Sequence, residues 1–168
     1  MKNIFYCIND GNWERYTTPI ELGEEGLYTI YYYSADLLNN EEEVKSITVK
    51  IDKTAPETTY SISSFEGKNG WHVSNVTIAL NASDNASGIN ATYYRIDEGE
   101  WQEYKEEIVV TKQGEHIIEF YSIDNAGNEE EAKNLTVKID KSEPETIYSI
   151  SPSSPAGTVF TFPETGIP

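Results

Sequence analysis

The sequence repeats itself at a fixed interval of 88 residues. Residues 4–63 can be laid over residues 92–151 without a gap, which places Trp13 on Trp101 and many tyrosine, glycine and aspartate positions on their equivalents. A fixed period of this kind indicates an array of one structural module. Since the interval lies within the usual size of a single domain, the sequence predicts modules of about 88 residues arranged in tandem.

The repeat also predicts where the modules begin and end. Asp52 and Asp140 each lead into Lys-x-x-Pro-Glu-Thr, and proline ends a strand and stiffens the chain that follows. We therefore expect an amino-terminally truncated module at 1–53, a complete module at 54–141, and the start of a third module or a tail at 142–168. On this division we expect the sequence to be a segment of a longer protein.

Alternation of apolar and polar residues with a period of two dominates the sequence, and no stretch shows a helical stripe. In the complete module His116, Ile118 and Phe120 share one face of a long strand, which we expect to point inward. About seven short strands are predicted there, over 58–62, 76–82, 92–96, 100–104, 108–110, 116–122 and 135–139. Seven alternating strands in one module predict an all-β fold, a sandwich of the Ig-like or fibronectin type.

Glycine and asparagine exchange at one turn of the repeat. Gly127, in the loop Asp124–Asn128, is replaced by Asn39 in the first copy. These two residues adopt positive φ most readily, so the exchange predicts a left-handed turn position. Asp97–Gly99 is a second turn, between two strands.

Composition excludes several classes of partner. Acidic residues number 29 and basic residues 12, giving a net charge of −17, so nucleic acid and anionic membrane surfaces would be repelled. Because no apolar h-region follows Met1 we expect no signal peptide, and no apolar run in the sequence is long enough to span a membrane. The single cysteine, Cys7, cannot form an internal disulfide. Because its counterpart is Arg95, which normally reaches water, we expect Cys7 to be partly exposed.

Four short motifs follow one another in the complete module. They are Tyr-x-Ile-Asp-x-Gly-x-Trp-x-x-Tyr over 94–104, Gly-x-His over 114–116, Tyr-Ser-x-Asp-x-Ala-Gly-Asn-x-Glu over 121–130 and Asp-x-x-x-Pro over 140–144. Together they resemble the Ig-like, fibronectin type III-like repeats of bacterial and archaeal cell-surface and secreted proteins. The first copy departs from the pattern at Asp36–Asn40. The resemblance implies an extracellular spacer, stalk or adhesion role without catalysis, or an accessory domain of a secreted hydrolase.

Enzyme signatures are absent from the sequence, which has no glycine-rich phosphate loop, no paired cysteine motif and no Gly-x-Ser-x-Gly. We therefore expect no catalysis. Of the two histidines, His72 and His116, the second is expected to be a hydrogen-bonded structural imidazole. The acidic runs Glu41–Glu43 and Glu129–Glu131 adjoin a turn and are expected to be solvated.

Calcium binding is one interpretation of the loops at one end of the sandwich. Those loops and the incoming linker would gather five oxygen-bearing residues, Asp52, Asp84, Asn85, Asp124 and Asn125. Calcium takes six to eight oxygen ligands, and such a cluster supplies several of them. The alternative is that each side chain closes its own turn by accepting nearby backbone amides, and the sequence favours this alternative.

Two further kinds of surface site are predicted. Outward tyrosines are candidates for contact with a carbohydrate or protein ligand, although cross-strand aromatic pairs also stabilise sheets; they are Tyr31, Tyr33, Tyr93 and Tyr121. Trp13 and Trp101, with Tyr16 and Tyr104, form either a sugar-stacking platform or ordinary packing. Asn-x-Ser/Thr sequons, which are candidate glycosylation sites, occur at Asn75, Asn81, Asn85, Asn90 and Asn134.

The predicted partners are adjacent Ig-like modules and a cell-surface glycan or protein. The ends of the sequence add one more prediction. Residues 145–151 and 157–162 read as the first strands of a third module, whereas the first copy begins at its third strand. We expect the tail strand Thr146–Ile150 to complete the amino-terminal half-module, either by folding back within one chain or by exchange between chains.

Overall fold

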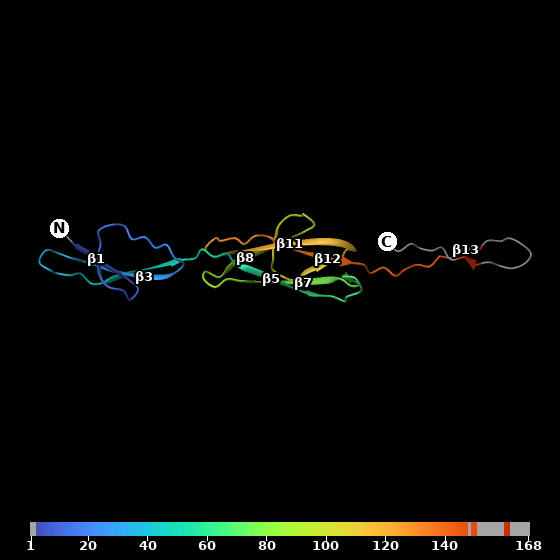
Figure 1. Cartoon of the computed structure of the whole chain (residues 1–168), viewed down its shortest axis with the longest axis horizontal. Coiled ribbons are helices and arrows are strands. Elements are labelled where there is room, and N and C mark those ends of the chain that lie inside the picture. The colour runs from blue at the N-terminus through green and yellow to red at the C-terminus, as the bar shows by residue number, and fades with distance from the viewer. Residues whose placement is uncertain (1–2, 148, 151–159, 162–168) are drawn as a thin grey trace, which may run out of the picture.

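The computed structural model describes residues 3–147, 149–150 and 160–161 of the 168-residue chain. Within these ranges every regular element is a β-strand, so the all-β prediction is confirmed. Neighbouring strands are antiparallel apart from one short parallel pair. Figure 1 shows the sheets following one another along the long axis, with β1 and β3 towards one end and β13 beyond the other end of the β5–β12 region.

The first four strands form a single sheet, which we call the amino-terminal sheet. Its strands are β1 (Asn3–Ile8), β2 (Glu14–Arg15), β3 (Gly26–Ala35) and β4 (Lys45–Ile51), in the spatial order β2-β1-β3-β4. Each pair of neighbours is antiparallel. Among the described residues no second sheet packs on either face of this one.

The next eight strands form two sheets that face each other, and we call them the two-sheet unit. The smaller sheet has the order β10-β7-β5, from β10 (Ile108–Val110), β7 (Val76–Ser83) and β5 (Glu57–Ser63). The larger has the order β6-β12-β11-β8-β9, from β6 (Trp71–His72), β12 (Lys133–Ile139), β11 (Gly114–Asp124), β8 (Ile89–Ile96) and β9 (Gln102–Glu103). The seven strands expected here are all present, and β6 is an addition that the sequence pattern did not predict.

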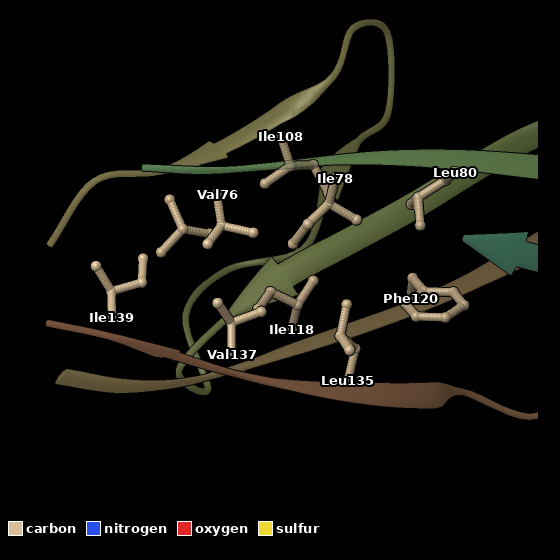
Figure 2. Close-up of a cluster of buried hydrophobic side chains, with 10 residues drawn as sticks. Val76, Ile78, Leu80, Ile108, Ile118, Phe120, Leu135, Val137 and Ile139 are labelled. Carbon is tan, nitrogen blue, oxygen red and sulfur yellow. The ribbon is translucent and has the colours of Figure 1, made fainter. Parts of the chain in front are cut away.

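Alternating side chains of the two sheets meet between them, as Figure 2 shows. From the larger sheet Ile118 and Phe120 point inward, as predicted, and are at most 1% exposed. The cluster contains Val76, Ile78, Leu80, Ile108, Val110, Ile118, Phe120, Leu135, Val137 and Ile139. Burial of such side chains is worth about 1.5–3 kcal/mol each, so this layer is the main stabilising element of the unit. The arrangement is consistent with a β-sandwich.

The amino-terminal sheet resembles the larger sheet of the two-sheet unit, but among the described residues no second sheet covers it. Tyr32 stands opposite Tyr6 in the β1–β3 pair, as Phe120 stands opposite Tyr94 in the β8–β11 pair. Phe120 is 1% exposed whereas Tyr32 is 36% exposed, and Ile47 of β4 is 54% exposed. The same alternation therefore gives a buried face in one sheet and an open apolar face in the other.

Two turns agree with the sequence analysis. Gly127 has a φ of 94° and Asn39 a φ of 62°, which confirms the left-handed position inferred from their exchange. Asp97 and Glu98 both have positive φ, and the amide of Gly99 donates to the carbonyl of Ile96 at 3.0 Å, closing the predicted turn.

The carboxy-terminal strands pair with each other. β13 (Ser149–Ile150) and β14 (Phe160–Thr161) are antiparallel, and the rest of the two predicted tail strands is either non-regular, as at Glu145–Ile147, or outside the described residues. The prediction that the tail folds back within one chain is therefore wrong. The six residues from Lys141 to Thr146 span at most about 18 Å, whereas β11 alone is about 36 Å long, so the tail does not reach the amino-terminal sheet.

Candidate functional site

Three carboxylates converge where the amino-terminal sheet joins the two-sheet unit. Asp52 follows β4, Asp84 follows β7 and Asp124 ends β11, and one oxygen of each lies within 4.8 Å of the other two. These are the three aspartates that the sequence grouped as calcium ligands. Asn85 and Asn125, the other two residues of that group, line an open hollow beside them.

Asp84 closes its own turn. Its Oδ1 accepts the backbone amides of Ala86, Ser87 and Gly88 at 3.1, 2.9 and 2.6 Å. This is the pattern expected of an aspartate that initiates a turn. One oxygen of Asp84 is thus already occupied by three donors of the same loop.

Asp124 closes the equivalent turn at the end of β11 and is 1% exposed. Its Oδ1 accepts the amides of Ala126, Gly127 and Asn128 at 2.7–2.9 Å, and its Oδ2 accepts the Asn128 side-chain amide at 2.7 Å. Burial acts to raise the pKa of Asp124, but the hydrogen bonds from Asn128, Gly127 and Ala126 together hold the pKa below its usual value. The loop therefore stabilises the charged carboxylate.

Asp52 differs from the other two because it links the amino-terminal sheet to the loops of the two-sheet unit. Its Oδ2 accepts the backbone amide of Ser87 at 2.9 Å, and its backbone carbonyl accepts the Asn128 side-chain amide at 3.3 Å. Its Oδ1 accepts the amide of Thr54 at 3.1 Å, which turns the chain away from β4. The contacts thus fix the direction in which the chain enters β5.

A second group of contacts, which we call the Glu25 clamp, holds the same linker on its other side. Glu25 Oε2 accepts the Thr54 hydroxyl at 2.6 Å and the Lys53 amide at 3.2 Å, and Lys53 Nζ donates to the carbonyl of Gly23 at 2.6 Å. The Thr54 hydroxyl, followed by the Lys53 amide, holds the pKa of Glu25 below its usual value.

An arrangement like the Glu25 clamp recurs after β12, with donors and acceptors at the positions 88 residues later. Gln113 Oε1 accepts the Lys141 amide at 2.6 Å and the Ser142 hydroxyl at 2.9 Å. Lys141 Nζ donates to the carbonyl of Thr111 at 2.7 Å, and Asp140 Oδ1 accepts the Ser142 amide at 2.9 Å. Each of these residues is the counterpart, 88 positions on, of one in the first linker.

The calcium hypothesis and the turn-closing alternative predict different measurements. Bound calcium raises the melting temperature with calcium concentration, and Asp84→Asn abolishes the rise. Turn closure alone gives the same melting temperature with calcium or with a chelator, and Asp84→Asn lowers both equally. Magnesium at the same concentration is the control for ionic strength.

The outward face of the larger sheet carries an aromatic cluster. Tyr93 and Tyr121 stack with ring centroids 5.3 Å apart, and Trp101 meets Tyr121 edge to face at 4.7 Å. The Arg95 guanidinium lies 4.7 Å from the Trp101 ring and forms two hydrogen bonds with Glu119. Trp101, which is 37% exposed, is therefore partly engaged in packing.

The amino-terminal sheet repeats this cluster. Phe5 and Tyr33 stack at 5.3 Å, and Trp13 meets Tyr33 edge to face at 4.8 Å. Tyr31 lies opposite Cys7 on the same face. Sequence reasoning selected the tyrosines and treated the tryptophans separately, because the alternation predicts the hairpin but not that Trp101 packs edge to face on Tyr121.

A buried polar network lies between the two sheets of the unit, and sequence reasoning missed it. Glu130 is 8% exposed; its carboxylate accepts the Thr58 amide at 3.0 Å, the Ser122 amide at 2.9 Å and the Thr58 hydroxyl, and Lys133 Nζ lies 3.1 Å away. The Ser122 hydroxyl also lies 2.7 Å from that of Thr92. The prediction that Glu129–Glu131 is solvated is therefore wrong for Glu130, because Thr58 of β5 donates its amide and its hydroxyl to the Glu130 carboxylate.

Both histidines form hydrogen bonds with neighbouring groups of the fold. His116 is 7% exposed, with Nδ1 2.6 Å from Asp97 Oδ2 and Nε2 3.2 Å from the Lys112 carbonyl, which confirms the predicted hydrogen-bonded imidazole. The His116 hydrogen bond is the largest factor that lowers the pKa of Asp97. His72 Nδ1 lies 2.7 Å from the Ser64 hydroxyl.

Cys7 is 6% exposed, so the prediction of partial exposure is wrong. It shares its sheet face with Phe5, Tyr31 and Tyr33. Its side chain is much shorter than that of Arg95, its counterpart, and ends beneath these rings instead of reaching water.

The asparagines of the five sequons, Asn75, Asn81, Asn85, Asn90 and Asn134, are all exposed. Asn75 Oδ1 accepts Lys141 Nζ at 3.0 Å, so a glycan there would adjoin the second linker. Glycosylation at these positions stays a prediction.

In the part of the chain that the structure describes, no helix has the length and apolar character needed to cross a membrane. Comparison of the sequence with protein-family models gave no match, and comparison with curated proteins gave none either.

Proposed function

We propose that this chain is a segment of a tandem array of Ig-like modules that serves as a semi-rigid, non-catalytic spacer in an extracellular or cell-surface protein. Its partners along the array are neighbouring modules of the same kind. The proposal rests on the strand order, on the contacts that recur at 88 residues, and above all on the linker at Asp52.

The strand order supports an Ig-like module. One sheet has the order β5-β7-β10, and the other has β12-β11-β8-β9. In an Ig-like sandwich the first, second and fifth strands share one sheet and the third, sixth and seventh share the other. Leaving out the two-residue β6, the unit follows this arrangement, with its short fourth strand β9 on the second sheet.

Recurring contacts support a tandem array. The stacked pair Phe5–Tyr33 returns as Tyr93–Tyr121 with the same centroid distance of 5.3 Å. The lysine contact of the Glu25 clamp returns at Lys141. A repeat that retained only its apolar pattern would not reproduce individual side-chain contacts at its linkers.

The observation that carries the spacer proposal is the pair of hydrogen bonds that Asp52 makes across the junction, to Ser87 and Asn128. A linker tethered only by its own chain leaves neighbouring domains free to reorient. Here the linker residue itself bonds to two loops of the next unit, which restricts the angle between the two parts. The net charge of −17 favours solubility and discourages self-association of such an array.

Residual dipolar couplings test this proposal directly. In the full chain we expect one alignment tensor to fit the amides of β1–β4 and β5–β12 together. Asp52→Ala removes the bond to Ser87, so the two regions should then require separate tensors. Asp140→Ala is the matched control: it removes the same turn contact at the second linker and should leave the common tensor intact. Separate tensors in the unaltered chain would refute a semi-rigid spacer.

A second candidate function is carbohydrate or protein binding by an adhesion module, or by an accessory domain of a secreted hydrolase. The recurring clusters around Trp13 and Trp101 favour it, because outward aromatic groups at a fixed spacing offer a multivalent surface. Packing of Tyr121 and Arg95 on Trp101 favours the structural role instead.

A glycan array followed by calorimetry separates these two readings. For binding, we expect a ligand whose affinity falls when Trp101→Ala is introduced, with further loss on adding Trp13→Ala. For packing, Trp101→Ala lowers the stability of the two-sheet unit and no ligand is retained. Lys105→Ala, on the neighbouring exposed turn, is the control for a general surface change.

A further inference from the structure

We propose that the His116–Asp97 pair is a pH-sensitive contact that fixes the loop holding the second linker, whereas the equivalent residues at the first linker, Tyr28 and Asn9, do not respond to pH. The second linker then loosens as the pH rises, and the first does not. The inference rests on the proposed spacer function, because the loop concerned holds a linker between modules. Two observations carry it: the hydrogen-bond partners of the imidazole, and the contacts made by its counterpart.

Both ring nitrogens of His116 face groups that only accept hydrogen bonds. Nδ1 lies 2.6 Å from Oδ2 of Asp97, and Nε2 lies 3.2 Å from the carbonyl oxygen of Lys112. A neutral imidazole carries a proton on one nitrogen only, whereas the imidazolium carries one on each. The residue is 7% exposed, so water does not readily replace either partner. Only the protonated ring satisfies both contacts at once.

The Asp97 carboxylate is held in its charged form. The hydrogen bond from His116 is the largest cause that lowers the pKa of Asp97, and the amide of Ile117, which donates to Oδ1 at 2.9 Å, lowers this pKa further. A charged carboxylate is an acceptor and not a donor. The proton between the two side chains therefore belongs to the imidazole, and its loss leaves a lone pair facing an acceptor.

The first copy shows that the loop carbonyl receives a hydrogen bond from this position. Tyr28, the counterpart of His116, donates its hydroxyl to the carbonyl of Glu24 at 3.0 Å, and Glu24 is the counterpart of Lys112. A tyrosine hydroxyl keeps its proton near neutral pH. The same contact is thus permanent in one copy and depends on the charge of a ring in the other.

Asn9, the counterpart of Asp97, keeps the backbone contact of the aspartate without its charge. Its Oδ1 accepts the amide of Thr29 at 2.9 Å, as Asp97 Oδ1 accepts the amide of Ile117 at 2.9 Å. An amide side chain does not titrate. The two copies therefore make the same backbone contacts, once with uncharged side chains and once with a charged pair.

The carbonyl of Lys112 belongs to the loop that holds the second linker. On one side of it the carbonyl of Thr111 accepts Lys141 Nζ at 2.7 Å, and on the other Gln113 Oε1 accepts the Lys141 amide at 2.6 Å. The Glu25 clamp at the first linker has the same order of contacts. Loss of the His116 contact therefore frees this loop at its middle residue.

The charged side chains of the segments adjoining the pair are Glu98, Lys112, Glu115 and Lys138. Lys112 adds to the lowering of the pKa of Asp97, and Glu98 acts on Arg95. Glu115 and Lys138 lie on the outward face and pair with each other at 3.2 Å. On β12 the residue opposite the imidazole is Val137, and β7 and β10 contribute apolar side chains to the core. Within these segments the imidazole is the group whose charge changes between about pH 5 and pH 8.

The other histidine, His72, lies near the same linker, since its carbonyl accepts the Asp140 amide at 2.9 Å. Its Nδ1 lies 2.7 Å from the hydroxyl of Ser64. A hydroxyl donates or accepts as required, so both charge states of His72 are satisfied. The response of the linker to pH is thus assigned to His116, and a variant of His72 tests the assignment.

Nitrogen-15 NMR of the full chain at a series of pH values tests the inference. At about pH 5.5 we expect both ring nitrogens of His116 to carry a proton. As the pH rises to about 8, the order parameters of the backbone amides of 112–113 and 141 should fall from about 0.85 towards 0.6. The equivalent amides of 24–25 and 53, measured in the same spectra, are the internal control and should stay near 0.85.

Exchange of the pair for its counterparts should remove the response. The double change Asp97→Asn with His116→Tyr gives the second copy the side chains of the first, which the first copy shows to be compatible with the backbone contacts. The order parameter of the Lys141 amide should then be the same at both ends of the pH range. His72→Asn is the matched control and should leave the response at Lys141 unaltered.

Three results would overturn the proposal: a ring of His116 that carries only one proton at about pH 5.5, order parameters at Lys141 that do not change with pH, or a response that His72→Asn abolishes. Failure of the spacer function gives a different result, because the alignment tensors of β1–β4 and β5–β12 report on the first linker. Separate tensors together with a pH response at Lys141 would refute the spacer and leave the pH-sensitive contact standing. A common tensor without that response would do the reverse.

Discussion

Replacement of Glu130 by glutamine is expected to destabilise the two-sheet unit strongly, although the change keeps the size and shape of the side chain. The carboxylate sits between the two sheets and receives the amide and hydroxyl of Thr58, the amide of Ser122 and the ammonium of Lys133. All four groups are donors. A carboxylate accepts at both oxygens, whereas glutamine accepts at one and donates from the other.

The size of the destabilisation follows from the hydrogen bonds that each of the two carboxylate oxygens of Glu130 accepts. If the glutamine carbonyl takes the position of Oε1, it retains the Thr58 hydroxyl and the Ser122 amide. Its NH2 group then faces the Thr58 amide and Lys133 Nζ, both donors, at the position of Oε2. A lost hydrogen bond to a charged group, with a buried donor left unsatisfied, costs about 1.5–3 kcal/mol. Lys133 is 40% exposed, so its loss adds at most about 1 kcal/mol.

We therefore expect Glu130→Gln to lower the free energy of unfolding of the two-sheet unit by about 2–4 kcal/mol. Urea denaturation gives the total, and hydrogen exchange of the Ile118 and Val137 amides assigns the loss to this unit and not to the amino-terminal sheet. Glu129→Gln, one residue away and exposed, is the matched control and should change stability by less than about 0.5 kcal/mol. Equal effects of the two changes would refute the account of a charge-dependent network.

Three further predictions concern the core, acid stability and the thiol. Phe120→Ala should cost about 3–5 kcal/mol in urea denaturation, whereas the exposed counterpart Tyr32→Ala should cost under about 1 kcal/mol; similar costs would mean that the amino-terminal face is covered. The hydrogen bond from His116 lowers the pKa of Asp97 below its usual 3.8, so its contribution to stability is present above that pH and lost as pH falls further. Asp97→Asn should flatten the fall in melting temperature between about pH 5 and pH 2, and an unchanged slope would contradict this. Cys7 should react with a thiol reagent at least about tenfold more slowly in the native chain than in urea; equal rates would place it at the surface.

Much of the fold could be predicted from the sequence because the alternation of apolar and polar residues along a strand shows which side chains point inward. The alternation around Phe120 identified both the strand and its inward face, and the exchange of Gly127 for Asn39 identified a backbone conformation. These properties depend on neighbours within a few residues. The convergence of Asp52, Asp84 and Asp124 could be predicted as well, since strand ends in a two-layer fold meet at a common edge.

What escaped prediction depends on contacts between distant segments. Glu130 reads as one of three acidic residues at a turn, and only the arrival of Thr58, 72 positions earlier, makes it a buried acceptor. Cys7 is buried because larger side chains on neighbouring strands extend past it. The recurrence of a glutamate at 42 and 130, with a serine eight residues before each, was the available sign of the polar network.

The short parallel pair of strands has a mechanical consequence. β6 runs beside β12, with Trp71 opposite Lys138 and His72 opposite Ile139, and the Asp140 amide donates to the His72 carbonyl at 2.9 Å. Tension applied at the two ends of the unit pulls the segment containing β5 and β6 one way and β12 the other. Because the two strands point in the same direction, their hydrogen bonds lie across the pull and must shear together instead of opening one after another. Stretching force on this unit is thus resisted in shear by the β6–β12 pair near its exit, in addition to the β5–β7 pair at its entry.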